Sequence, residues 1–135
     1  MSRLITPVVD LAQAADMLRI AAAAKTNTYP EPGGYAVAVL TSKGNIYEGV
    51  AYKSDTQTLT MHSEATGLAN AAIHGEKDVV AITGPNCHIC KQLIWESALN
   101  SGIDIQIVLN EKDTISLVPI SQLMPYPWPD EDGKK

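Results

Sequence analysis

The spacing of apolar residues predicts one helix near the N-terminus, followed by a β-hairpin. Apolar side chains recur mostly every three or four positions across residues 8–25, which is the periodicity of an amphipathic helix. Prolines and glycines within 30–34 interrupt regular structure. The segments 35–41 and 45–52 favour strands and flank a Ser-Lys-Gly turn, so they predict an antiparallel pair.

The rest of the chain alternates between helical and strand-like patterns. Residues 62–75 predict a helix that ends at a glycine, and the apolar run 79–83 is typical of a strand covered on both faces. Residues 87–100 predict another helix, while 103–110 and 114–119 predict strands that precede a short helical turn. Because helices alternate with strands, we expect crossover connections and an α/β fold with three layers, α/β/α.

The chain is expected to form a single domain, residues 1–135, in which about 125–135 form a flexible C-terminal tail. The N-terminal region lacks the basic start and unbroken apolar stretch of a signal peptide, and no apolar run approaches the about 20 residues that span a bilayer. We therefore expect a cytoplasmic protein with no membrane partner. The net charge of −5 and the pI of about 5.0 disfavour nucleic acid as a partner, because a polyanion is repelled at long range.

The residues best suited to chemistry lie in two short segments, each at the start of a predicted helix. His62 and Glu64 are in the first, and Cys87 and Cys90, with CxxC spacing, are in the second. In a reducing compartment such a pair indicates metal binding or redox chemistry. Unpaired N–H groups at a helix N-terminus favour thiolate over thiol. His62, Cys87 and Cys90 would give Zn²⁺ three ligands and leave a fourth position for water, whose proton Glu64 could accept and hand on.

The sequence resembles the cytidine deaminase family, in its short-chain form, over most of its length. The resembling segments, in the family's order, are the hairpin YAVAVLTSKGNIYEGV, the helix HSEATGLANAAIHGE, the motif CHICKQ and the closing ISQLMPYPWP. An H-x-E motif followed by C-x-x-C is the signature of zinc deaminases. The resemblance implies a five-stranded mixed sheet, a Zn²⁺ cofactor and hydrolytic deamination of a cytosine-containing nucleoside with release of ammonia, as in pyrimidine salvage.

Several positions depart from the family's pattern. Most short-chain members have cysteine where His62 stands and arginine where Ala65 stands. One neutral imidazole and two thiolates leave zinc no net charge for an arginine to compensate. The family's ribose-binding asparagine and glutamate correspond to Ala51 and Lys53, so a plain nucleoside should bind less well. We interpret Lys53 as the sign of a different group at the ribose end, such as a phosphate or another anion.

Three further residues are candidates for substrate contacts. Ser63 is expected to help hold the base, and Asn86 stands where the family has proline, which alters the pocket rim. Trp128 corresponds to a closing phenylalanine that, in family tetramers, stacks on the substrate of a neighbouring subunit, so we expect it to stack on the base. The resemblance accordingly implies a homo-oligomer, either a tetramer or a dimer.

The residues leave several alternatives open. The cysteine pair could be a redox centre, although that motif normally follows the first strand of its fold. A structural zinc site needs a fourth protein ligand, for which His88, between the cysteines, is the nearby candidate. The enzyme could act on a modified nucleoside, a nucleotide or a nucleoside antibiotic, in the manner of blasticidin-S-deaminase-like relatives. Finally, the chain could be a non-catalytic, zinc-stabilised binding module.

Overall fold

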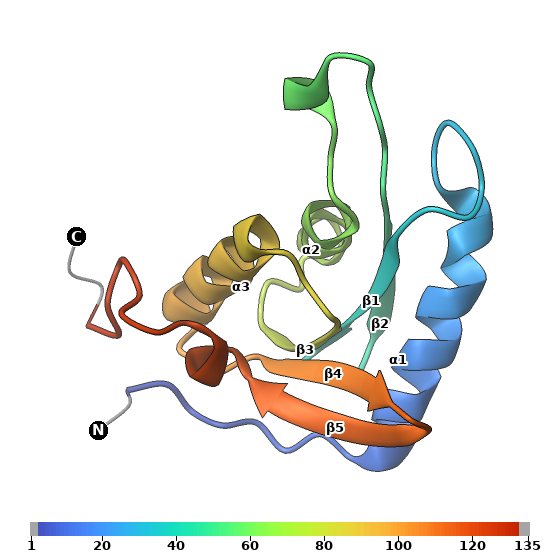
Figure 1. Cartoon of the computed structure of the whole chain (residues 1–135). Coiled ribbons are helices and arrows are strands. Elements are labelled where there is room, and N and C mark those ends of the chain that lie inside the picture. Colours follow the sequence, from blue (N-terminus) through green and yellow to red (C-terminus); the bar gives the residue numbers. More distant parts are fainter. Residues whose placement is uncertain (1–2, 133–135) are drawn as a thin grey trace.

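A computed structural model of the protein describes residues 3–132. Within them, three α-helices surround a five-stranded sheet (Figure 1). The helices are α1 (Leu11–Ala24), α2 (Ser63–Ile73) and α3 (His88–Ser101). The strands are β1 (Ala36–Thr41), β2 (Ile46–Val50), β3 (Val79–Thr83), β4 (Gln106–Glu111) and β5 (Thr114–Pro119).

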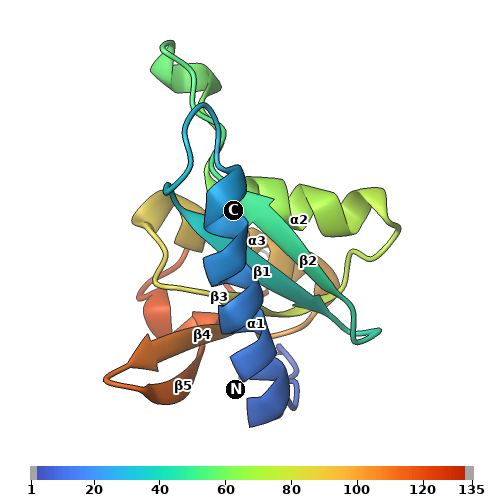
Figure 2. The same ribbon diagram turned by 90° about the vertical axis from the view of Figure 1, so that its right-hand side faces the viewer.

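The sheet is mixed, with the strand order β2-β1-β3-β4-β5. The pair β3–β4 is parallel, and the other three neighbouring pairs are antiparallel. Helix α1 covers one face of the sheet, and α2 and α3 cover the other, so that in Figure 2 α1 lies in front of the strands. The expected three-layer α/β/α fold with a five-stranded mixed sheet is confirmed.

The element bounds differ from the sequence prediction where polar contacts set the ends. The first helix begins at Leu11 instead of residue 8, because the Asp10 carboxylate caps it and accepts a bond from the Gln13 N–H (2.7 Å). The strand expected from residue 103 begins only at Gln106. Residues 103 and 104 pair instead with Ile5 of the N-terminal segment. Both differences arise from contacts that periodicity does not report.

Each face of the sheet has its own apolar core. Met17 of α1 packs with Leu40 on one face, and Trp95 of α3 packs with Ile82 on the other, all nearly without solvent exposure. Burying a side chain of this size contributes about 1.5–3 kcal/mol. The two cores fix α1, α2 and α3 against the strands and hence fix where the helices begin.

Helix α2 lies directly on β2 because Gly49 has no side chain. A Cβ at Gly49 would be 2.1 Å from the carbonyl oxygen of Ser63 and 2.4 Å from the backbone nitrogen of Gly67. No real Cβ contact is that short, so only glycine permits this approach. Gly49 thereby places the first turn of α2, which carries His62 and Glu64 of the predicted site, against the sheet.

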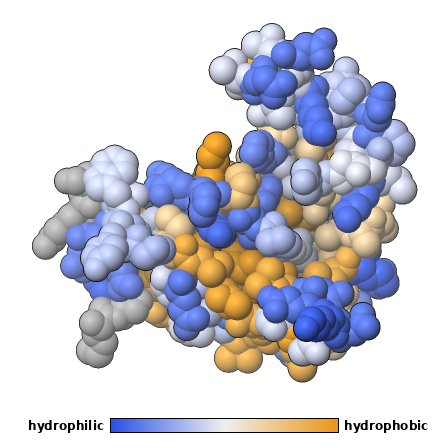
Figure 3. All heavy atoms as spheres, in the orientation of Figure 1, coloured by the Kyte–Doolittle hydropathy of each residue, from blue (hydrophilic) through white to orange (hydrophobic). Residues whose placement is uncertain are grey.

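Two segments project beyond the sheet at the top of Figure 1. They are the loop 28–34 and the excursion 52–61. Tyr29 and Tyr52 join them, with parallel rings whose centroids are 4.0 Å apart, and Tyr52 also pairs with Met61. This projection is mainly hydrophilic on the face shown in Figure 3, whereas hydrophobic atoms gather lower on that face, over β4 and β5.

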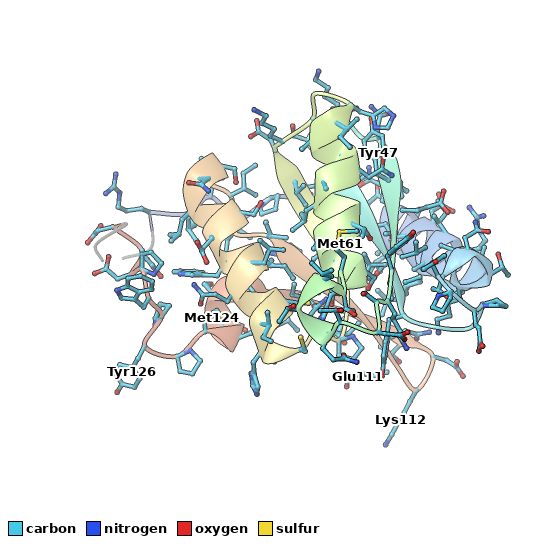
Figure 4. All side chains as sticks on the ribbon, turned by 90° about the horizontal axis from the view of Figure 1, so that it is seen from above. Tyr47, Met61, Glu111, Lys112, Met124 and Tyr126 are labelled. Carbon is cyan, nitrogen blue, oxygen red and sulfur yellow. The ribbon has the colours of Figure 1, made fainter. Side chains whose placement is uncertain are left out.

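The C-terminal segment runs back along α3. The Gln92 Nε2 donates to the main-chain oxygen of Trp128 (2.8 Å), and the indole Nε1 of buried Trp95 donates to that of Pro129 (2.7 Å). Tyr126 projects away from the body of the molecule (Figure 4). The flexibility expected of residues 125–135 stays a prediction, and its last three residues lie outside the described part of the chain. Among residues 3–132, no helix has both the length and the apolar character required to cross a membrane.

Candidate active site

Three residues from two helix starts bring metal-ligating atoms together. His62 is the N-cap of α2, Cys87 is the N-cap of α3, and Cys90 lies in the first turn of α3. Their ligand atoms all lie within 4.8 Å of one another. His62 Nδ1 is 3.2 Å from the Sγ of Cys90 and 3.6 Å from that of Cys87. Tetrahedral zinc, with bonds of about 2.0 Å to nitrogen and 2.3 Å to sulfur, places such atoms about 3.5 Å apart, so the cluster fits Zn²⁺.

The two sulfurs have different surroundings, since Cys87 is exposed and Cys90 is buried. Burial raises the pKa of the Cys90 thiol, and the neighbouring Cys87 and Glu64 raise it further. Burial at Cys90 opposes the effect of the helix N-terminus, which favours thiolate. A thiolate at this position requires a cation beside it, which matches the chemistry of the donor set.

The Glu64 carboxylate is buried beside the cluster, with 7% of the residue exposed. Each of its oxygens accepts one hydrogen bond. The Ser63 hydroxyl donates to Oε1 (2.9 Å), and the Asn86 Nδ2 donates to Oε2 (2.8 Å). The two donors come from different elements, since Ser63 opens α2 and Asn86 precedes α3. The carboxylate is therefore held in one orientation between the two helix starts.

These groups lie in a cavity of about 670 Å³, enough for a ligand of nucleoside or nucleotide size. Met61, just before α2, forms part of its wall (Figure 4). The lining residues are Lys25, Tyr35, Ala36, Val37, Ala51, Lys53, Thr60, Met61, His62, Ser63, Glu64, Thr83, Gly84, Pro85, Asn86 and Cys87. Sequence reasoning missed Lys25. It directly follows a helix with no catalytic motif, and only the packing of α1 on the sheet brings it to the cavity.

The structure brings most of the predicted substrate contacts to this cavity. Ala51, Lys53, Ser63 and Asn86 all line it. Trp128 does not: it is 64% exposed and lies beside α3, away from the cavity of its own chain.

His88 is exposed at the start of α3 and is not part of the ligand cluster that the described residues form. The cluster consists of His62, Cys87 and Cys90 alone, which gives three protein ligands and not four. This ligand number is typical of catalytic zinc sites, whereas structural sites use four.

Residues 11–103, more than half of the chain, match the family model described as "Cytidine and deoxycytidylate deaminase zinc-binding region". No curated protein matches the sequence closely enough to be assigned as a relative.

The fold is similar to that of solved cytidine deaminases. The enzyme from Burkholderia pseudomallei has a TM-score of 0.70 and 20% identity, with 84% of this chain and 98% of that chain covered. The enzyme from Mycobacterium leprae has a TM-score of 0.66 and 21% identity, with coverages of 82% and 96%. The enzyme from Mycobacterium tuberculosis has a TM-score of 0.68 and 17% identity, with coverages of 90% and 98%. Identities this low establish the fold alone.

A three-ligand cluster beside a buried carboxylate at a cavity is an arrangement typical of zinc-dependent hydrolases. The match over residues 11–103 then specifies the family: the chain belongs to the cytidine and deoxycytidylate deaminase family. It is a cytidine-deaminase-like aminohydrolase with Zn²⁺ as its cofactor.

Proposed function

We propose that the protein hydrolyses a cytosine-containing nucleoside or a related compound, with release of ammonia. The observation that carries this proposal is that Glu64, His62 and Cys87 line one cavity, with buried Cys90 completing the ligand cluster beside it. The family match and the similar cytidine deaminases support the reaction type.

The chain's own residues have distinct roles in this reaction. His62, Cys87 and Cys90 would hold Zn²⁺, which supplies a Lewis acid that makes a water molecule a nucleophile near neutral pH. Glu64 accepts the proton of that water and delivers it to ring N3 as oxygen bonds to C4. Glu64 then carries the second proton to the departing amino group. The C4–N bond breaks, and the products are ammonia and the corresponding uracil-type ring.

The remaining cavity residues act on the substrate or on Glu64. Ser63 holds one carboxylate oxygen through its hydroxyl and lines the base end, while Ala51 and Lys53 line the end where the family reads ribose.

Zinc analysis combined with ammonia release tests the proposal. We expect about one zinc ion per chain and turnover of at least one of cytidine, deoxycytidine, CMP and cytosine. Glu64→Gln should retain zinc and lose turnover, whereas Glu96→Gln, at an exposed carboxylate on α3, should change neither. Zinc without ammonia from any of these compounds would instead indicate a non-catalytic binding module.

We also propose that the preferred substrate carries an anionic group, because two cations lie at the cavity. Lys25 and Lys53 both line it, and neither forms an ion pair with a carboxylate in the described part of the chain. Glu31 lines a smaller adjoining hollow with Lys53 without pairing with it. In a chain of net charge −5, two unpaired cations beside one cavity favour a bound anion.

The backbone holds both lysines relative to the projecting loop 28–34. The Lys53 N–H donates to the Tyr29 oxygen (3.0 Å), and the Gly33 N–H donates to the Lys25 oxygen (2.8 Å). Both side chains therefore start from fixed main-chain positions.

A comparison of CMP with cytidine tests this proposal. We expect kcat/KM to be at least about 10-fold higher for CMP, and Lys53→Ala and Lys25→Ala each to remove most of that difference. Lys77→Ala, at an exposed site after α2, is the matched control and should change neither substrate. Fast cytidine turnover that is unaffected by Lys53→Ala would contradict an anion at this end.

We further propose a homo-oligomer, a dimer or tetramer, in which Trp128 contacts the substrate of a neighbouring copy. The exposure of Trp128 outside its own cavity supports this role. Light scattering should show more than one copy, and Trp128→Ala should raise KM without loss of zinc. A fully active monomer would contradict the proposal.

A further inference from the structure

Asn86 makes its contacts through the nitrogen of its side-chain amide. Nδ2 donates to the Glu64 Oε2 (2.8 Å) and to the main-chain oxygen of Thr83 (3.2 Å). Both partners can only accept, so the nitrogen must face them, and the chemistry fixes the orientation of the amide. Asn86 is 93% buried, with 7% exposed, so this orientation is also enclosed by packing.

The amide oxygen of Asn86, by contrast, has no hydrogen-bond partner among the described residues. Oδ1 is buried and unpaired, and it faces Gly84, where a Cβ would lie 3.0 Å from it. A buried acceptor without a partner costs folding free energy. The amide oxygen therefore gives no reason for an asparagine at this position, and the favourable contribution of the residue comes from the two bonds of Nδ2, one to Thr83 and one to Glu64.

That bond completes the support of the Glu64 carboxylate. Ser63 holds Oε1 from the start of α2, and Asn86 holds Oε2 from the segment before α3. With one donor alone, the carboxylate could turn about its last torsion, which is broad for glutamate. With donors on both oxygens, the remaining lone pairs keep a fixed direction relative to the ligand cluster of His62, Cys87 and Cys90.

We propose that Asn86 is a positioning residue that holds the Glu64 carboxylate in the orientation required for proton transfer, a role that rests on the proposed deamination. In this role Asn86 acts on Glu64 and not through a polar bond to the substrate, because Nδ2 is bonded to protein and Oδ1 is buried. Misplacement of a proton-transfer group slows the chemical step more than it weakens substrate binding.

Kinetics and stability of Asn86→Ala test the proposal. We expect kcat to fall about 10- to 100-fold, KM to stay within about twofold and zinc content to be unchanged. The thermal midpoint should fall by a few degrees at most, because the loss of the two Nδ2 bonds is partly offset by removal of the unpaired Oδ1. Asn45→Ala is the matched control, since Asn45 donates the same kind of amide bond to another buried carboxylate, Glu76, outside the cavity. It should lower the midpoint and leave kcat unchanged.

The side-chain amide resonance of Asn86 gives a readout that does not depend on turnover. Recorded by NMR and assigned through its loss in Asn86→Ala, the resonance should move in Glu64→Gln and stay in place in Glu76→Gln. A resonance that keeps its chemical shift in Glu64→Gln would overturn the proposal. So would an Asn86→Ala variant that keeps its kcat or that loses zinc.

If the proposed deamination itself were wrong, the experiments would give a different result. The wild-type protein would then release no ammonia from any substrate, whereas failure of the positioning role requires an active wild type and an equally active Asn86→Ala.

Discussion

Two buried carboxylates lie at opposite ends of α2 and have similar partners but different surroundings. Glu64 is in the first turn of the helix, and Glu76 follows its end. Each residue is 7% exposed, and each accepts bonds from a hydroxyl and from an asparagine amide. The same chemistry is therefore present twice, about one helix length apart.

The partners of Glu76 all belong to the β1–β2 hairpin. The Thr41 hydroxyl donates to Oε1 (2.6 Å), the Asn45 amide donates to both oxygens (3.0 and 2.9 Å), and the Tyr47 hydroxyl donates to Oε2. The bonds from Thr41 and Tyr47, followed by those of Asn45, lower the pKa of Glu76 to about 2, although burial opposes the shift. Tyr47 lies at this end of α2 in Figure 4, and its ring stacks on His74.

The two carboxylates differ in how many of their oxygen lone pairs are left without a hydrogen-bond donor. Glu76 accepts four bonds and is not among the residues that line the cavity, so it ties the hairpin to the end of α2. Glu64 accepts bonds from Ser63 and Asn86 and lies at the cavity beside the ligand cluster. A carboxylate with free lone pairs beside a metal site can move protons, whereas one saturated by donors can only hold structure.

The largest expected effect is that of zinc removal. It should act at the Glu64 end of α2, beside the ligand cluster, and not at the Glu76 end. Extraction with a chelator, or the change Cys90→Ser, should abolish turnover and lower the thermal midpoint, because ligand binding contributes to stability. Atomic absorption and ammonia release measure this, and added Zn²⁺ should restore the extracted protein but not the variant. An extracted protein with undiminished turnover would contradict the role of the cluster.

The next effect is that of removing each carboxylate in turn. Glu64→Gln should lower kcat about 10²- to 10⁴-fold with little change in the thermal midpoint, because a general acid and base is lost. Glu76→Gln should leave kcat within about twofold and lower the midpoint by several degrees, because the charge that its donors stabilise is lost. Steady-state kinetics and thermal unfolding of both variants provide the check. The comparison fails if Glu76→Gln loses turnover with zinc and fold intact.

Adding a methyl group to a glycine near each end of α2 should give a smaller effect. Gly49 of β2 packs against the first turns of α2, and Gly75 follows its end. Gly49→Ala would press on the carbonyl of Ser63 and should cost about 3 kcal/mol of unfolding free energy, with reduced turnover. Gly75→Ala meets no atom within 4 Å but has a φ of +79°, so it should cost about 1 kcal/mol and spare turnover. Urea unfolding measures both costs. Equal costs for the two changes would contradict the close approach of α2 to β2.

The smallest expected effect is the pH dependence contributed by Glu76. Its folded-state pKa of about 2 lies below the ordinary value of 4.5. Ionised Glu76 therefore stabilises the fold fully above about pH 4.5, and this contribution is lost as the pH falls toward 2. The difference in thermal midpoint between the wild type and Glu76→Gln should be largest near about pH 7 and shrink below about pH 4.5. A gap that stays constant with pH would contradict the assigned pKa.

The sequence by itself determined the order of elements and the residue types of the site. Apolar spacing reports which face of a segment is buried, and that is a local property, so the helices and strands could be predicted to within a few residues. The H-x-E and C-x-x-C motifs are also local, since each places its members on one helix start. His62, Glu64, Cys87 and Cys90 could therefore be identified before any fold was known.

Only the tertiary structure decided which distant groups meet. Lys25 reaches the cavity because α1 packs on the sheet, and Asn86 bonds to Glu64 because two helix starts lie side by side. The bonds of Glu76 to the hairpin and the position of Trp128 outside the cavity have the same origin. Contacts between buried polar atoms depend on the three-dimensional path of segments far apart in the chain, and neither periodicity nor motif spacing records that path.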